Sequence, residues 1–250
     1  MLKRILALLL CLCALLPGWA AAEDTGEIPE DFVLRHGDRN SKKIAITVDD
    51  CYLNRRKWIT YDADLCRKYG IHMTFFPIVY TGCLNEKYRD IWLDVLDSGC
   101  EIGSHTWSHI KLGNRNRKTL LNAMGTFQEE LDKTLGFHYQ VRWLRPPYGT
   151  LKGKHLNEKT VISLLKKFGY DHIIHWEVSE TKNLEKALSR TKNGSILLFH
   201  AQEKDSRFLD RLIPALQEQG YEMVTVSELF GYDPPETSDE LYVYDRKNYE

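Results

Sequence analysis

The sequence predicts an α/β fold built on a parallel β-sheet, and two observations carry this prediction. From Lys43 to about Leu229, apolar runs of strand length alternate with segments of helical period, a pattern that places each helix between two parallel strands. The apolar runs are continuous rather than alternating, which is typical of strands buried on both faces. An open doubly wound sheet and a closed barrel both have these properties, and periodicity does not separate them.

The expected elements follow one another without an internal repeat or a low-complexity segment. Predicted strands cover residues 44–48, 73–79, 101–103, 141–145, 173–176, 195–199 and 223–226. Predicted helices cover residues 63–69, 91–97, 118–135, 161–168, 184–190 and 208–219. Most of these helices are followed by a glycine, which readily adopts the left-handed conformation that ends a helix.

Residues 1–22 have the layout of a secretory signal peptide. Lys3 and Arg4 precede an apolar run at residues 5–16, and small residues follow at 20–22. The apolar run is too short for a membrane span, which needs about 20 residues. We therefore expect cleavage, no stable membrane span afterwards, and a secreted, periplasmic or cell-wall-associated protein.

The remainder of the chain is predicted to form one domain, residues 43–230, with a linker before it at 23–42 and a polar C-terminal tail after it at 231–250. The formal net charge is −1. A net charge this close to zero does not indicate a surface that binds nucleic acid. The basic residues form no polybasic membrane patch in the sequence. Partners must therefore be inferred from individual sites, and the oligomeric state is left open.

Four cysteines follow the predicted signal peptide: Cys51, Cys66, Cys83 and Cys100. An exported protein can form disulfides, and four cysteines allow three complete pairings among which sequence does not choose. Free buried thiols are the alternative. The spacing lacks the close pairs of a structural zinc site.

Unusual polar residues follow the predicted strands, where parallel α/β folds place their functional sites. Asp49 and Asp50 close an apolar strand, and adjacent carboxylates repel unless a cation compensates, although Asp is also common in turns. His105 and His109 can face one side of a helix or turn and bind zinc through imidazole nitrogen, although surface histidines also occur at this spacing. With Asp50 they leave a coordination position open for water.

Three further strand ends carry candidate residues. Arg145 precedes two prolines that fix a rigid exit from its strand, and its guanidinium suits either a catalytic carboxylate or a structural salt bridge. His200 ends an apolar strand, where a histidine suits general acid catalysis or a structural role. Trp107 and Trp176 are candidates for stacking on sugar rings, although core packing explains them equally well.

Together these motifs resemble those of the polysaccharide deacetylases, the NodB-homology group of carbohydrate esterase family 4. Residues 47–50 resemble the family's TFDD opening, 104–109 its histidine metal motif, and 145–149 its RPPYG motif, while 194–200 is similar to its late strand-and-histidine motif. The resemblance runs from about residue 43 to 229. It implies a distorted (β/α)7 barrel, so that residues 43–230 would be a polysaccharide deacetylase catalytic domain.

The resemblance also implies an activity and a cofactor. The expected reaction is removal of N-acetyl groups from amino sugars of an acetylated polysaccharide, such as peptidoglycan or a chitin-like polymer. Asp50, His105 and His109 would bind the metal, zinc or another divalent ion such as cobalt.

Four other residues match catalytic positions of the family. Asp49 would be the general base, and Arg145 would orient it and keep it ionised. The backbone N–H of Tyr148 would help to stabilise the oxyanion, and His200 would protonate the departing amine.

The sequence also departs from the family pattern. Cys51 stands where the family usually has glycine, and the segment after Trp176 lacks the aspartate that usually orients the acid histidine. Glu177 and Glu180 are candidates to replace it. This departure keeps two alternatives open: an O-acetyl carbohydrate esterase on the same scaffold, or a catalytically weakened carbohydrate-binding homologue.

Overall fold

A long central strand, β2 (Lys43–Cys51), organises the main sheet of the computed structural model, which describes residues 32–113, 115–151 and 156–249. β2 pairs in parallel with β3 (Met73–Pro77) and β8 (Ile196–His200), and its first residues pair with β9 (Glu222–Val224). β4 (Glu101–Ile102) pairs with the outer side of β3. The predicted strands at these positions are confirmed, since continuous apolar runs bury both faces of the sheet.

A second parallel sheet completes the barrel. It consists of β1 (Val33–Leu34), β7 (His172–Ile174) and β6 (Trp143–Leu144), with β7 in the middle. Isolated bridges join it to the main sheet, from Ser104 to Leu144 on one side and from Val178 to Leu197 on the other. The closure through single bridges makes this a distorted (β/α)7 barrel of the NodB-homology type, as predicted.

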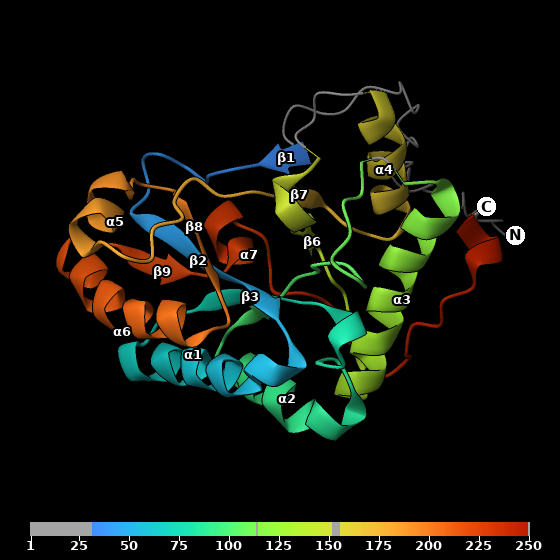
Figure 1. Ribbon diagram of the computed structural model, residues 1–250, viewed down its shortest axis with the longest axis horizontal. Coiled ribbons are helices and arrows are strands. Elements are labelled where there is room, and N and C mark those ends of the chain that lie inside the picture. The colour runs from blue at the N-terminus through green and yellow to red at the C-terminus, as the bar shows by residue number, and fades with distance from the viewer. Residues whose placement is uncertain (1–31, 114, 152–155, 250) are drawn as a thin grey trace, which may run out of the picture.

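Helices cover the outside of the barrel (Figure 1). They are α1 (Arg56–Tyr69), α2 (Arg89–Asp97), α3 (Arg117–Leu135), α4 (Leu156–Lys167), α5 (Leu184–Arg190), α6 (Glu203–Glu218) and α7 (Val226–Phe230). Helices α1 and α6 pack together on one flank, and α3 and α4 on the other. Short 3-10 helices cover Leu53–Arg55, Val79–Thr81, Glu86–Tyr88, Pro147–Gly149 and Arg246–Tyr249.

The chain outside residues 43–230 differs from a simple linker and tail. The signal-peptide prediction for residues 1–22 lies outside the described residues. Within residues 23–42, Phe32 is buried, and β1 pairs with β7 as an additional strand. A strand of two residues is too short to be detected from hydrophobic periodicity. Among the described residues, no helix is long and apolar enough to cross a membrane.

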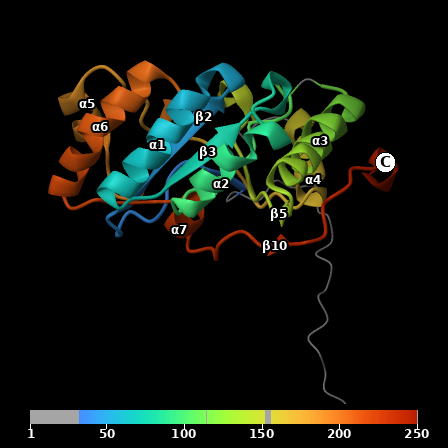
Figure 2. The same cartoon turned by 90° about the horizontal axis from the view of Figure 1, so that it is seen from below.

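The C-terminal segment runs along one side of the molecule towards α3 (Figure 2). Its strand β10 (Thr237–Ser238) pairs antiparallel with β5 (His138–Tyr139). The ring of Tyr244 lies so close to Gly125 of α3 that a Cβ on Gly125 would come within 2.1 Å of it. A glycine inside a helix costs about 1 kcal/mol in stability relative to alanine. The contact with Tyr244 explains the glycine at position 125, because a larger residue would collide with the ring.

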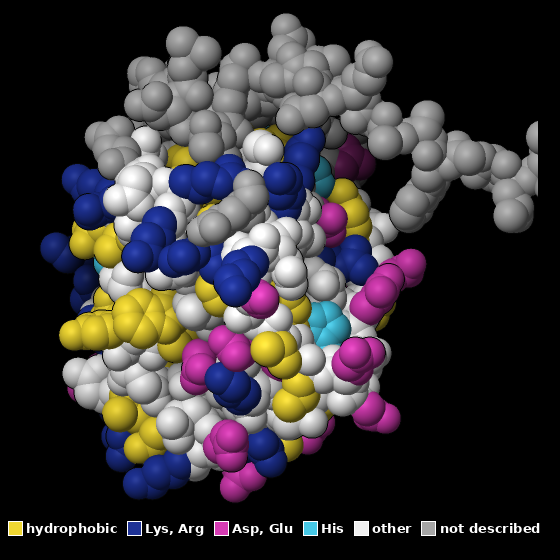
Figure 3. Space-filling model, turned by 90° about the vertical axis from the view of Figure 1, so that its right-hand side faces the viewer, with side chains coloured by type: hydrophobic (Ala, Val, Ile, Leu, Met, Phe, Trp, Pro, Cys, Tyr) yellow, Lys and Arg dark blue, Asp and Glu magenta, His cyan; other side chains and the backbone are white. Residues whose placement is uncertain are grey.

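The charged side chains on the face seen in Figure 3 are of both signs.

Candidate active site

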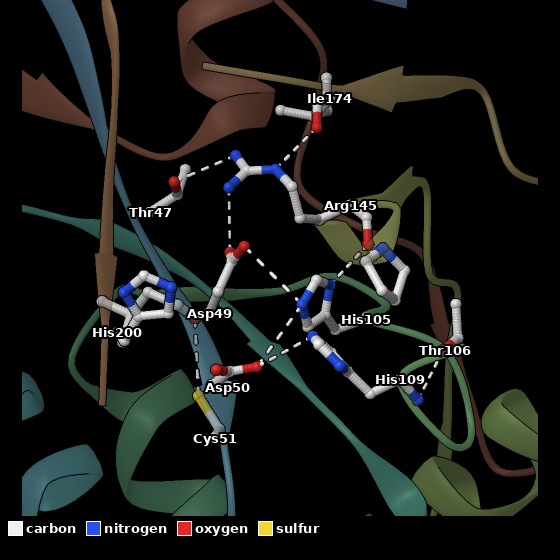
Figure 4. Close-up of polar contacts among 12 residues, drawn as sticks. Thr47, Asp49, Asp50, Cys51, His105, Thr106, His109, Arg145, Ile174 and His200 are labelled. Carbon is white, nitrogen blue, oxygen red and sulfur yellow. Dashed lines mark hydrogen bonds and ion pairs between the residues drawn. The ribbon is translucent and has the colours of Figure 1, made fainter. Parts of the chain in front are cut away.

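The carboxyl ends of β2 and β8 place two candidate residues next to each other. Asp49 of β2 is the register partner of His200 of β8. Because all strands of this sheet are parallel, their carboxyl ends open at one edge of the barrel. The segments after β4 and β6 reach the same edge, since Ser104 bridges to Leu144. Figure 4 shows that six of the sequence-predicted residues converge here: Asp49, Asp50, His105, His109, Arg145 and His200.

Asp50, His105 and His109 form a compact cluster at this edge. Nε2 of His109 lies 3.4 Å from Oδ1 of Asp50, and Nε2 of His105 lies 3.7 Å from the same oxygen. One ligand atom from each residue lies within 4.8 Å of the others. Two ligands of a tetrahedral zinc ion, each about 2.1 Å from the metal, are about 3.4 Å apart. The three residues predicted as ligands thus fit a zinc-sized ion.

A hydrogen bond fixes the tautomer of His105. Its Nδ1–H donates to the backbone carbonyl of Arg145 over 2.6 Å, which leaves Nε2 as the free lone pair facing the cluster. Burial lowers the pKa of His105, against the opposing effect of Asp49. A neutral imidazole oriented by such a bond is the form in which histidine binds a metal.

The Asp50 carboxylate has two further neighbours on the short helix that follows β2. The hydroxyl of Tyr52 donates to Oδ1 of Asp50 over 3.1 Å, and Arg55 lies 3.8 Å from Oδ2. Burial and the charge of Asp50 raise the pKa of Tyr52 to about 12, so the hydroxyl stays protonated. A hollow of about 480 Å³ opens here, lined by Tyr52, Leu53, Asn54, Arg56 and Thr81.

Asp49 is held from the opposite side by a fully buried arginine. Nη1 of Arg145 donates to Oδ1 of Asp49 over 3.0 Å. The same guanidinium donates through Nη2 to Oγ1 of Thr47 over 3.0 Å and through Nε to the carbonyl of Ile174 over 2.6 Å. With both partners buried, the ion pair is little screened by water. The other oxygen of Asp49 faces His105 at 3.8 Å.

His200 has an aspartate partner that the sequence analysis missed. Its Nδ1 lies 3.2 Å from Oδ2 of Asp205, and its backbone N–H donates to the same oxygen over 2.9 Å. Burial lowers the pKa of His200, but the bond to Asp205 and the charges of Asp49 and Asp50 outweigh it and raise the pKa overall.

Both glutamates considered as substitutes for the family's aspartate are engaged elsewhere. Glu177 pairs with Arg39 and accepts from Ser195, while Glu180 pairs with Lys186. The suggestion that either orients His200 is therefore wrong. Asp205 takes this place from the first turn of α6. The sequence signal that could have identified Asp205 is its position five residues after His200, in a helix that follows directly on a strand.

Five non-glycine residues at this edge, Leu151 among them, have left-handed backbone conformations. The φ angles are 54° at Asp50, 70° at Thr106, 53° at His109 and 60° at Tyr148. Such angles are uncommon outside glycine and cost of order 1–3 kcal/mol each. They aim Asp50 and His109 at each other, and they turn the chain at Tyr148, whose ring centroid lies 4.6 Å from that of His109.

The aromatic residues near the cluster differ in exposure. Trp107 and Trp176, the candidates for either sugar stacking or core packing, are half-buried and pack against the core. Trp176 touches Gly149 closely enough to exclude a Cβ there. Tyr148 and Tyr80 are 64% and 70% exposed, and the ring centroid of Tyr80 lies 5.4 Å from that of Trp107. Tyr80 was not singled out from the sequence.

Cys51 is the last residue of β2 and directly follows Asp50. Its thiol is buried and donates to the carbonyl of Val48 over 3.5 Å, and burial raises its pKa well above the usual value. Cys51 is a free thiol in the structure. A protonated, buried thiol is a weak ligand, because the thiolate is the form that binds metals.

An Asp-His-His cluster beside a second carboxylate held by a buried arginine, at the carboxyl edge of a parallel barrel, is typical of hydrolases that activate water. Comparison of the sequence with known protein families narrows this class of hydrolases to one family. The polysaccharide deacetylase family matches residues 36–173, and the chain belongs to this family.

Similar sequences include proteins named as peptidoglycan deacetylases. A peptidoglycan-N-acetylglucosamine deacetylase of Bacillus cereus is 30% identical over 220 residues, covering 82% of this chain and 95% of that protein. The peptidoglycan-N-acetylmuramic acid deacetylase PdaC of Bacillus subtilis is 29% identical over 195 residues. That match covers 77% of this chain but only 39% of PdaC.

Solved structures support the fold. The structure of PdaC from Bacillus subtilis superposes with a TM-score of 0.63 at 27% identity, covering 77% of this chain and 91% of the other. A carbohydrate esterase family 4 pseudoenzyme from Bacillus anthracis gives a TM-score of 0.67 at 20% identity, covering 79% and 68%. At that identity the second likeness bears on the fold alone.

Proposed function

We propose that this chain is a metal-dependent hydrolase that removes N-acetyl groups from amino sugars of a polysaccharide, with peptidoglycan as the first substrate to test. The observation that carries the proposal is the joint placement of the Asp50-His105-His109 cluster and the Asp49–Arg145 pair, with ligand atoms 3.4–3.7 Å apart. Membership of the polysaccharide deacetylase family and the names of the relatives point the same way.

The metal is proposed to be zinc or another divalent ion such as cobalt. Bound at the cluster, it would act as a Lewis acid and lower the pKa of a water molecule. Asp49, whose free oxygen faces the cluster, would accept the proton of the attacking water. Arg145 would keep Asp49 ionised and fix its rotamer.

The remaining residues serve the leaving group and the developing negative charge. The backbone N–H of Tyr148, presented by its left-handed turn, would donate to the carbonyl oxygen as that oxygen becomes negative. His200, with its raised pKa, would carry the proton that the departing amine requires. Asp205 would orient the ring of His200 through Nδ1 and leave Nε2 directed at the substrate.

The substrate is proposed to lie across this edge of the barrel. The exposed ring of Tyr148 and the Tyr80–Trp107 pair offer surfaces for sugar rings, and Trp176 forms a packed wall behind Gly149. Residues 43–230 would be the catalytic domain. Residues 1–22 would direct export, and the protein would act outside the cytoplasm, at or near the cell wall.

The decisive experiment measures acetate release from N-acetylglucosamine oligomers and from peptidoglycan fragments. The chain is stripped of metal with a chelator, then supplied with zinc or cobalt. We expect release only after a metal is restored. Metal bound tightly without release from any N-acetyl substrate would refute the deacetylase proposal.

The same assay on O-acetylated sugars tests the esterase alternative. An ester leaving group demands less of an acid than an amine does, so a defective His200 would favour esters. Because Asp205 partners His200, we expect N-acetyl substrates to be cleaved. Glycan binding without any acetate release would instead indicate the carbohydrate-binding alternative.

A further inference from the structure

Two cysteines lie in contact at the end of the barrel opposite the candidate active site. Cys66 belongs to the last turns of α1, and Cys100 directly precedes β4. Their sulfur atoms are 3.4 Å apart, with one thiol donating to the other sulfur. Both residues are buried, at 1% and 6% exposure. Because His105 follows the carboxyl end of β4, Cys100 marks the opposite end of this strand.

We propose that Cys66 and Cys100 form a disulfide that ties α1 to the start of β4. One S–S bond forms, and the two thiols lose two protons and two electrons. A small-molecule or protein disulfide accepts them through a mixed-disulfide intermediate and leaves as two thiols. The S–S bond is about 2.05 Å long, so the sulfurs must approach by about 1.4 Å.

Cys100 has a second polar neighbour besides Cys66, the hydroxyl of Ser98. The contact with Cys66 lowers the pKa of Cys100 against the effect of burial, and Oγ of Ser98, which lies 2.7 Å from the carbonyl oxygen of Val95, lies 3.2 Å from the Cys100 sulfur. The thiolate is the nucleophile in disulfide exchange. At Cys83 burial is the cause of the shift, and it raises the pKa to about 12.

The position of the pair predicts an effect on stability rather than on turnover. The disulfide would close a loop between residues separated by 34 positions, which restricts the unfolded chain. For a chain of this size the melting temperature should rise by roughly 10 °C. The bond lies away from the cluster, so acetate release should be the same in the oxidised and reduced protein.

Peptide mapping of the full chain tests the bond itself. The reduced, denatured chain is refolded with oxidised and reduced glutathione, the remaining thiols are alkylated, and the protein is digested without reduction. Mass spectrometry should find the peptides of Cys66 and Cys100 joined, about 2 Da lighter than their sum because two hydrogens are lost. Alkylation of both residues, or a bond from either one to another cysteine, would overturn the proposal.

Variants test the effect on stability, with the same chain compared under oxidising and reducing conditions. The redox-dependent difference in melting temperature should vanish in Cys66→Ser and Cys100→Ser and persist in the buried control Cys83→Ser. Comparing each protein with itself removes the cost of placing a serine in the core. Equal redox dependence of the melting temperature in all three variants would contradict the pairing. If a variant fails to fold, the peptide map of the unchanged chain decides whether Cys66 and Cys100 are bonded.

Discussion

The two ends of the barrel use the left-handed backbone conformation in different ways. At the amino ends of the strands, it falls on glycines: Gly70 before β3, Gly99 before β4, Gly169 before β7, Gly194 before β8 and Gly220 before β9. At the carboxyl ends it falls on Gly82 and Gly149 and also on five residues with side chains: Asp50, Thr106, His109, Tyr148 and Leu151. Glycine adopts this conformation without a steric penalty, whereas other residues pay about 1–2 kcal/mol.

This difference indicates which end of the barrel is shaped by chemistry. At the amino ends any residue that permits the turn is sufficient, and glycine is the least strained choice. At the carboxyl ends, Asp50 and His109 supply side chains that glycine lacks, so the strain is retained together with the side chain. Strain of this kind concentrates at functional sites, and the rest of the fold must compensate for it.

The largest expected effect is on turnover at the carboxyl edge. Asp49→Asn keeps an oxygen that can accept from Arg145 but removes the base, so the rate of acetate release should fall about 10²- to 10⁴-fold. Steady-state assays with saturating metal measure this loss. The matched control is Asp171→Asn, which changes a half-exposed aspartate next to β7 at the other end of the barrel. Comparable losses in both variants would refute the role of Asp49.

A smaller effect should follow from Asp205→Asn. The carboxylate raises the pKa of His200, and the acid form of His200 is lost as pH rises through that pKa. Removing the charge lowers the pKa, so the alkaline limb of the kcat/KM profile should move to lower pH, with roughly a 10-fold loss of activity at the optimum. A purely structural role would lower activity without moving the limb. Glu203→Gln in the same helical turn is the control, because Glu203 pairs only with Arg207 among the described residues.

The smallest effects concern backbone strain. Apart from its neighbours in the chain, no described residue comes within 4 Å of the Cβ that an alanine at position 70 would have, so Gly70→Ala tests conformation without crowding. We expect a loss of about 1 kcal/mol in the free energy of unfolding and unchanged turnover. Denaturant titration measures the first and acetate release the second. A neutral result would mean that the left-handed conformation is not costly here.

Tyr148→Gly is the converse substitution at the strained end. Relief of strain should raise the free energy of unfolding by up to about 1 kcal/mol, because the ring is 64% exposed and loses little beyond its contacts with His109 and Lys111. If the ring also supports the substrate, KM should rise while kcat changes less. A stability loss of the size expected for Gly70→Ala would contradict the contrast between the two ends.

Much of this architecture could be predicted because local signals and the fold agree. The apolar run at residues 44–48 and the glycine after α1 each have a local physical cause, burial on both faces and a left-handed turn. The Asp50, His105 and His109 cluster followed from the rule that parallel strands open their functional edge together.

The rest depends on contacts that no local pattern encodes. Asp205 partners His200 only because the first turn of α6 folds back onto the end of β8. The two-residue β1 is defined by its partner β7. The contact between Cys66 and Cys100 arises because α1 packs beside the turn that precedes β4. Sequence spacing left three pairings of the cysteines equally open.

Arg145 has a consequence for how this domain can evolve. Its guanidinium joins residues of β2 to the end of β7, so its loss would leave Asp49 as an uncompensated buried charge, a change that typically costs 3–5 kcal/mol. Loss of the His200 ring, which is one-third exposed, would still leave the buried Asp205 carboxylate the backbone N–H of the same position as a donor, so its replacement should cost less. In a lineage released from selection for turnover, we therefore expect His200 to be replaced first. Arg145 would be retained in such a lineage even after the catalytic activity had been lost.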